Sequence, residues 1–397
     1  MTKSTKSRIQ NKPRKPYVDY PLYAHNTGRW AKRIRGTIHY FGPWDNPQGA
    51  LEKLNQEWPY LSQGRTPPPT DAGDTCTLRF LCNSFLTSKR NKLNSKELSE
   101  RSFRDYFKTC EALISHFSRD RRVDDLRPDD FEGLRSKLAG RLGVVTLRNE
   151  INRCRVVFKF AHDQRLIDQP VNYGQSFNRP NAKSLRRARN DAGVIMFEAD
   201  ELLRIIDAAD VQIKAMVLLG CNAGFGNTDV ASLPQSAVDL ELGWVNFPRP
   251  KTEIRRRVPL WTETVDALRE AIAIRSQPLD PGDADLCFLT SRGRRWVRVQ
   301  PSKKNPGQIT PLDALSQKFA RQLKELGIKG RKNFYALRHT FETIGGESRD
   351  QVAVNAIMGH VDNTMAGVYR ERISDERLKA VVDTVHKWLF SNGTSNS

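Results

Sequence analysis

Apolar residues between positions 75 and 168 recur every three or four residues, which places them on one face of a helix. Two such stripes are Phe103, Phe107, Cys110, Ile114 and Phe117, and Leu147, Ile151, Cys154, Phe158 and Ala161. Between the stripes, Pro128 followed by two aspartates is typical of a first helical turn. We therefore expect a helical bundle over residues 75–168, inside a domain that spans residues 74–169.

The stretch from Gly28 to Gly42 alternates basic with apolar or aromatic residues at the period of a β-strand, and glycines interrupt it. Residues Pro47 to Glu57 then predict a short helix. We expect a small sheet packed on a helix within residues 1–65. Its basic and aromatic face could follow a nucleic-acid backbone, and an ordinary solvated strand would give the same pattern. The residues concerned are Arg29, Lys32, Arg33 and Arg35.

Helical spacing returns after residue 195, first around Leu202 and Ile206 and then around Met216 and Leu219. Between Trp244 and Leu260 the period shortens to that of a basic β-hairpin. Helices are expected again from Trp261 and from Leu312. A last amphipathic helix carries Leu378, Val381, Val382, Val385, Trp388 and Leu389. We place this third domain at residues 195–390, followed by a tail at 391–397.

Two segments separate these regions. Residues 66–70 read Thr-Pro-Pro-Pro-Thr, which breaks any regular element. Residues 170–194 are rich in Asn, Gly, Pro and Arg, and they include Lys183, Arg186 and Arg187. This basic linker could pass along a DNA backbone, or it could simply be flexible. The fold class is thus multidomain and mainly α, with a small hairpin or sheet in the last domain and a sheet plus helix at the N-terminus.

The charge of the chain indicates a polyanionic partner. Among 397 residues, 65 are Lys or Arg and 45 are Asp or Glu, a formal net charge of +20. Residues 1–40 alone hold ten Lys or Arg against one acid, Asp19, and their first part resembles a disordered basic arm. The densest apolar run, Ala215 to Ala223, is far below the roughly 18 residues of a membrane span. With no signal or lipidation motif visible, we expect a cytoplasmic protein.

Six cysteines form no CxxC pair and no ligand-like cluster with the seven histidines. We expect reduced, buried thiols and no metal site. No feature of the chain points to a small-molecule substrate.

Three features near the C-terminus fall in a fixed order. Leu337-Arg338-His339 comes first, Gly359-His360 follows, and Tyr369 lies nine residues beyond His360. Upstream, Lys251 occupies the turn of the expected hairpin. Cutting a phosphodiester requires a nucleophile, cations for the non-bridging oxygens and an acid for the leaving oxygen. A tyrosine, an arginine with histidines, and a lysine suit these roles. Each residue alone would more often be a surface charge, a packed histidine or a half-buried tyrosine.

In this order and spacing, the segment resembles the catalytic domain of the tyrosine recombinases of phage-integrase type. The resemblance implies that Tyr369 is the nucleophile, that Arg338, His339, His360 and Lys251 surround the phosphate, and that a 3′-phosphotyrosyl link forms without ATP, metal or other cofactor. It also implies a SAM-like core-binding domain at 74–169, an arm-type domain before it, duplex DNA as partner and a homo-oligomer, a tetramer, on DNA. The protein would then be associated with the nucleoid while bound.

Two positions depart from the family pattern. In Gly224-Phe225-Gly226-Asn227-Thr228-Asp229, the acidic position is kept as Asp229, but Gly226 stands where the first catalytic arginine is expected. Tyr335 replaces a histidine three residues before Arg338. Losing one preorganised donor typically costs roughly 10²–10³ in rate. Either Arg249 or Arg255 of the hairpin substitutes, or the chain is a DNA-binding protein without turnover.

Overall fold

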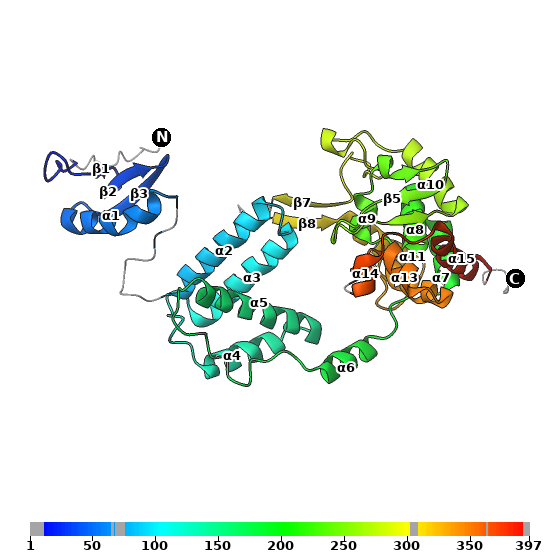
Figure 1. Ribbon diagram of the computed structural model, residues 1–397, viewed down its shortest axis with the longest axis horizontal. Helices are drawn as coiled ribbons and strands as arrows, with labels where there is room; N and C mark the ends of the chain where they lie inside the picture. Colours follow the sequence, from blue (N-terminus) through cyan, green and yellow to red (C-terminus); the bar gives the residue numbers. More distant parts are fainter. Residues whose placement is uncertain (1–11, 65–66, 68–75, 302–308, 363, 392–397) are drawn as a thin grey trace, which may run out of the picture. The chain divides into compact units, whose positions relative to one another are not determined.

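The computed structural model describes residues 12–64, 67, 76–301, 309–362 and 364–391. The chain divides into two compact units, Met1–Pro180 and Asn181–Ser397, each described here by itself (Figure 1). Most of the expected basic tail, the Pro-rich segment except Pro67, and residues 392–397 lie outside the described residues.

The N-terminal part of the first unit is a three-stranded antiparallel sheet with one helix. The strands are β1 (Tyr23–His25), β2 (Arg29–Ile34) and β3 (Thr37–Pro43), and the helix is α1 (Pro47–Leu61). Arg35 and Gly36 both have positive φ, as a two-residue type I′ hairpin requires. Trp30 and Phe41 of the sheet and Leu54 of the helix form the core. The predicted sheet and helix are confirmed, and the helix runs four residues further than expected.

The second part of this unit is a helical bundle, as predicted, and its described part has four helices. They are α2 (Leu78–Asn94), α3 (Glu100–Phe117), α4 (Pro128–Ala139) and α5 (Val144–Asp163). All five apolar residues of the predicted α5 stripe are buried. In α3 the buried centre is Leu113 with Cys110, so the stripe is displaced from the predicted one. Pro128 opens α4, and the Asp130 carboxylate accepts a 2.9 Å hydrogen bond from the Arg127 N–H.

Residues 170–193 have more structure than a linker suggests. Phe177 is fully buried in the bundle core, and Arg155 donates a 2.7 Å hydrogen bond to its carbonyl. Residues Ala182–Ala192 form helix α6, which buries none of its residues. The Asn, Gly, Pro and Arg content of the segment indicated a linker and concealed this helix.

The second unit is mainly helical and surrounds α8, in which every residue from Ala215 to Ala223 is buried. Besides α6, its α-helices are α7 (Ala199–Ala208), α8 (Val211–Ala223), α9 (Asn227–Ala231), α10 (Thr262–Ala273), α11 (Ala314–Glu325), α12 (Ala336–Gly345), α13 (Gln351–Met358), α14 (Met365–Tyr369) and α15 (Asp375–Ser391). Its strands are β4 (Val238–Asp239), β5 (Trp244–Asn246), β6 (Arg257–Pro259), β7 (Val297–Pro301) and β8 (Ile309–Asp313).

The predicted basic hairpin is present as β5 and β6, which pair antiparallel beside β4. A second hairpin, β7 with β8, was not predicted and extends away from the helices of this unit (Figure 1). The helix expected from Leu312 was therefore placed too early: Leu312 belongs to β8, and α11 begins at Ala314. The short apolar run Ile309-Thr310-Pro311-Leu312 fits either period, so its spacing alone did not distinguish strand from helix.

The last helix, α15, packs into the core of its own unit. Its predicted apolar residues are buried, except that Trp388 is only partly buried. The Trp261 indole donates a 3.1 Å hydrogen bond to the Val382 carbonyl, and Arg257 pairs with Asp375 at 2.9 Å. The chain after Tyr369 is thus anchored against β6 and α10.

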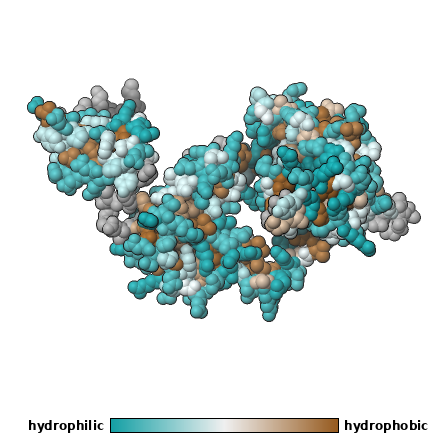
Figure 2. Space-filling model, viewed as in Figure 1, coloured by the Kyte–Doolittle hydropathy of each residue, from teal (hydrophilic) through white to brown (hydrophobic). Residues whose placement is uncertain are grey.

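The surface of each unit is mainly hydrophilic on the face drawn in Figure 2, and hydrophobic patches there are small and separate. Among the described helices, none is long and apolar enough to cross a membrane. All six cysteines are buried and unbonded, as predicted. The described residues contain no cluster of three or more His, Cys, Asp or Glu that could hold a metal ion.

Candidate functional site

The turn between α8 and α9 forms one wall of the site. Gly224 ends α8 in the left-handed region at φ 60°, whereas Gly226 is extended at φ −94°. The Gly226 N–H donates a 2.8 Å hydrogen bond to the Asp229 carboxylate, which caps the short α9. A Cβ built on Gly226 would lie 3.3 Å from that carboxylate and 3.4 Å from the Tyr335 ring. The backbone at position 226 therefore suits any residue, and a side chain there would be tight but not blocked.

Arg338, on the first turns of α12, is the buried centre of the site. Its guanidinium donates a 2.6 Å hydrogen bond to the Gly224 carbonyl and another to the Met358 carbonyl. It thereby joins the α8–α9 turn to the end of α13. Burial, and then the nearby Arg249, lower the pKa of Arg338 from its ordinary value.

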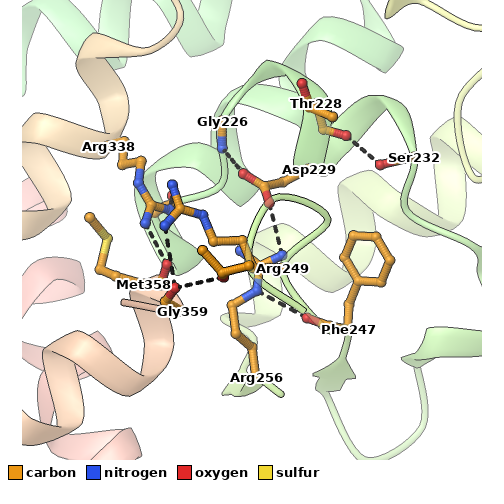
Figure 3. Close-up of polar contacts among 12 residues, drawn as sticks. Gly226, Thr228, Asp229, Ser232, Phe247, Arg249, Arg256, Arg338, Met358 and Gly359 are labelled. Atoms are coloured by element: carbon orange, nitrogen blue, oxygen red, sulfur yellow. Dashed lines mark hydrogen bonds and ion pairs between the residues drawn. The ribbon is translucent and has the colours of Figure 1, made fainter. Parts of the chain in front are cut away.

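Arg249 approaches Arg338 from the hairpin. Its Nη1 donates a 3.3 Å hydrogen bond to the Gly359 carbonyl, the carbonyl next to the one that Arg338 binds. The guanidinium groups of the two arginines lie side by side in Figure 3. Gly359 has φ 62°, and a Cβ there would come within 2.9 Å of the Arg249 Cβ. Glycine at 359 is thus required both by the backbone and by the close approach of the hairpin.

Arg256 is a site residue that the sequence analysis missed. Its side chain is fully buried, and its Nη2 pairs with the Asp229 carboxylate at 2.9 Å. Its Nε donates a 3.0 Å hydrogen bond to the Phe247 carbonyl, and its guanidinium lies 4.2 Å from the centre of the Phe225 ring. Burial lowers the pKa of Arg256 to about 10, although Asp229 opposes the shift. Alternation back from the buried Val258 would have placed Arg256 inward, but the run of three arginines concealed it.

His360 follows α13 and is half-buried beside these arginines. Its Nδ1 lies 3.3 Å from the Asn355 side-chain oxygen and 3.8 Å from the Glu342 carboxylate. Burial and then Arg338 lower the pKa of His360, with Glu342 acting in the opposite direction. A neutral imidazole is therefore favoured at neutral pH.

The other expected site residues are at the surface. Lys251 and Arg255 are exposed on the hairpin, and His339 is exposed on α12, where its ring meets that of Tyr335 at 5.6 Å. Tyr369 ends α14 with 76% of its surface exposed. Next to it, Arg370 pairs with Asp362 at 2.9 Å and ties this segment to the turn after His360. Within the described residues, no hydrogen bond joins Tyr369 to Arg338 or Arg249.

A cavity of about 730 Å³ adjoins the site. The hairpin residues Arg255 and Arg256 line one side, His360 lines another, and Arg370 lies on the wall towards Tyr369. The guanidiniums of Arg249, Arg256 and Arg338 thus lie near one another. Among the described residues, Asp229 pairs with Arg256, and Glu342 lies beside His360. Positive charge is in excess, so the arrangement favours an anionic ligand.

Residues 196–376 match the model of the phage integrase family. This part of the chain is a phage integrase domain. The match covers α7 to the start of α15 and therefore all the site residues above. No curated protein matched the chain.

Solved integrase structures show the same fold. A lambda integrase tetramer bound to a Holliday junction matches with a TM-score of 0.54 at 17% identity, covering 90% of this chain and 98% of that one. A lambda integrase dimer bound to a COC′ core site matches with a TM-score of 0.54 at 16% identity, covering 93% of this chain and 99% of that one. The Tn1549 transposon integrase in complex with transposon right end DNA matches with a TM-score of 0.54 at 16% identity, covering 78% of this chain and 100% of that one. The multidomain, mainly α fold predicted from the sequence is confirmed.

The basic residues of the small sheet do not share one face. Arg29 lies 5.4 Å from the centre of the Tyr40 ring on the sheet, whereas Lys32 lies 4.7 Å from that of Trp58 on α1. Arg35 is directed towards the end of α1, where it donates to the Ser62 carbonyl. A register shift between Trp30 and Ala31 changes the alternation that the sequence suggested. Arg33 is exposed.

On α6, by contrast, the three expected basic residues are neighbours. Lys183, Arg186 and Arg187 are exposed and spaced so that they share one helix face. Because α6 buries none of its residues, this face has no packing role within the described part of the chain.

Proposed function

We propose that the chain is a site-specific DNA recombinase that breaks and rejoins duplex DNA through a 3′-phosphotyrosyl intermediate. Membership of residues 196–376 in the phage integrase family supports a general role in DNA strand transfer. The observation that carries the mechanism is the convergence of Arg338, Arg249 and His360 around carbonyls 358 and 359, on the same unit as an exposed Tyr369.

In the proposed step, the Tyr369 phenolic oxygen attacks phosphorus and loses its proton. The bond between phosphorus and the 5′ oxygen breaks, the phosphate stays on the tyrosine, and the 5′ oxygen takes up a proton. Arg338 binds the non-bridging oxygens, since a guanidinium fork matches phosphate geometry. His360 and His339 assist proton transfer or bind phosphate, and Lys251 protonates the leaving oxygen. Attack by a 5′ hydroxyl on the phosphotyrosine reverses the step and needs no further energy source.

The partners follow from this role. We propose duplex DNA as substrate, held by the helical bundle (74–169) as core-binding domain, the integrase domain (195–390) and the α6 segment, with the N-terminal residues 1–65 on a separate arm site. The solved lambda structures contain a dimer and a tetramer on DNA, and we propose a tetramer for the synapse here. The protein would act in the cytoplasm, bound to the nucleoid.

A second function is favoured by one observation, the glycine at position 226. A chain without the first arginine could bind DNA as a regulatory factor and never cut it. A duplex nicked close to the scissile phosphate separates the two, because the short strand diffuses away after cleavage and leaves the covalent adduct trapped. The recombinase forms such an adduct, and a Tyr369→Phe variant binds the same DNA without forming it. A parent protein that binds its site tightly but forms no adduct would establish the regulatory function instead.

A further inference from the structure

The α8–α9 turn lacks the arginine that the resemblance to tyrosine recombinases places there. Two non-bridging oxygens carry the growing negative charge, and Arg338 alone reaches the centre from α12. Gly226 has no side chain, and no Lys or Arg occurs between Lys214 and Arg249. Any replacement must therefore come from the hairpin or from another element near Arg338.

Arg249 has the position that such a replacement requires. It and Arg338 bind the carbonyls of consecutive residues, Gly359 and Met358, so their guanidinium groups are held next to each other from two different elements. Two neighbouring cations repel each other, and the nearby Asp229 carboxylate is already bound to Arg256. A phosphate between them would relieve that repulsion.

The other hairpin arginines are unsuitable for different reasons. Arg256 is fully buried, and its guanidinium binds the Asp229 carboxylate and the Phe247 carbonyl. It therefore neutralises Asp229 and holds the hairpin in place. Arg255 is exposed, and no hydrogen bond or ion pair of its side chain is found within the described residues. Arg257 is exposed and pairs with Asp375 on α15. Among the described arginines of the hairpin, Arg249 is the one that combines partial exposure with a position beside Arg338.

We propose that Arg249 is the second phosphate-binding arginine of this enzyme and replaces, from the hairpin, the arginine missing at position 226. The proposal rests on the recombinase function above. Arg256 is a positioning residue in this arrangement, because its pairing with Asp229 takes the carboxylate away from Arg249. Compared with the family pattern, the phosphate-binding cation thus comes from the β5–β6 hairpin and not from the α8–α9 turn. The phosphate itself would bind in the same position, beside Arg338.

The test compares Arg249→Gln with the matched variant Arg255→Gln, which removes the same charge from the same hairpin. The substrate is a nicked duplex that carries the protein's own attachment site, recovered by sequencing the DNA beside its gene. Arg255 lines the cavity beside the site without contacting Arg338, so we expect Arg255→Gln to slow adduct formation by a few-fold at most. Arg249→Gln should be slower by about 10²–10³, the typical effect of removing one preorganised donor. Equal rates for the two variants would overturn the proposal.

A methylphosphonate at the scissile position controls for misfolding. This linkage is neutral, so it no longer requires the second cation. Arg249→Gln should regain most of its lost rate on the methylphosphonate, whereas Tyr369→Phe should remain inactive. A variant that is equally slow on both substrates has lost the shape of the site and not a charge contact, and that result would also overturn the proposal.

A separate measurement covers the case in which the parent protein forms no adduct, which would end the recombinase function. Inorganic sulfate then serves as a phosphate mimic, because an anion that binds the native state raises the thermal midpoint. At equal ionic strength, sulfate in place of chloride should raise the midpoint less in Arg249→Gln than in Arg255→Gln. If sulfate raises the thermal midpoint equally in both variants, Arg249 binds no phosphate-like anion. The proposal for Arg249 is then wrong, independently of the recombinase function.

Discussion

Arg338 and Arg249 donate hydrogen bonds to neighbouring carbonyls, those of Met358 and Gly359. One arginine comes from α12 and the other from the β5–β6 hairpin, so three separate stretches of the chain meet at the end of α13. The carbonyls offset part of the repulsion between the two cations. They also hold both guanidiniums without a bound ligand, which lowers the reorganisation required when a phosphate arrives.

Gly226→Arg tests where the phosphate is held. The backbone at 226 accepts a side chain, but its Cβ would be 3.3 Å from the Asp229 carboxylate. A new guanidinium there would also add to the positive charge of Arg338 and Arg249. In the parent background we expect no gain in adduct formation. In an Arg249→Gln background the new arginine should restore at least tenfold of the about 10²–10³ lost. The measurement is the rate of adduct formation by the single and double variants on one nicked substrate. A gain in the parent background would show that the centre lacks a cation.

The ionisation of His360 should respond to its neighbours. Burial, Arg338 and Arg249 lower its pKa, and Glu342 raises it. Arg249→Gln should therefore raise the pKa of His360, and Glu342→Gln should lower it further. The ring proton shifts of His360 in an NMR titration give both values, with His360→Gln to assign the signal. Because the folded pKa lies below that of the unfolded chain, His360 reduces stability only as pH falls through and below about 6.5. Shifts of the opposite sign would show that other charges control the ring.

Asp229→Asn should be strongly destabilising. The Asp229 carboxylate pairs with the buried Arg256, and leaving one member of a buried pair uncompensated typically costs about 3–5 kcal/mol. The matched change Asp375→Asn removes an exposed carboxylate that also pairs with a hairpin arginine, Arg257, and exposed pairs contribute about 0–1 kcal/mol. Native-state hydrogen exchange in α8 and α12 of the full chain measures both losses. Equal losses would mean that the Asp229 pair is screened like a surface pair.

Replacing Lys183, Arg186 and Arg187 together with Gln should weaken DNA binding without changing the cleavage site. Each phosphate contact contributes a slope of about −0.9 in log K against log salt for B-DNA, so the slope should become less steep by up to about 2.7. Deletion of residues 1–65 should also flatten the slope, and it should shorten the protected footprint as well. Filter binding between 50 and 200 mM salt, about the range in which such contacts are lost, gives the slopes. An unchanged slope would show that the α6 face does not touch DNA.

The spacing of apolar residues was sufficient to predict the helices whose buried residues form one continuous stripe. The α5 stripe and the α15 stripe were found in this way, since each helix has one apolar face. The β7–β8 hairpin and α6 were missed for different reasons: β8 carries Pro311 in a five-residue strand, and α6 lies in a segment whose Asn, Gly, Pro and Arg content indicated a linker. None of the described residues of these elements is fully buried, so core packing left little mark on their sequences.

The candidate site was only partly predictable for a related reason. Motif spacing located Arg338 and His360, which the structure brings together, and it nominated Arg249 with Arg255 as equals. Choosing between them required the contact with the Gly359 carbonyl, and finding Arg256 required its contact with Asp229. Both contacts join residues far apart in sequence, so no local pattern encodes them.

The central claim is that Tyr369 carries the DNA during the reaction. The most direct measurement traps the adduct on a nicked attachment-site duplex, digests protein and DNA, and identifies the linked amino acid and the linked DNA end by mass spectrometry. We predict one nucleotide-bearing peptide, modified at Tyr369 and attached through a 3′ phosphate, with a free 5′ hydroxyl on the other strand end. A 5′ linkage, or an adduct on another residue such as Tyr335, would contradict the account.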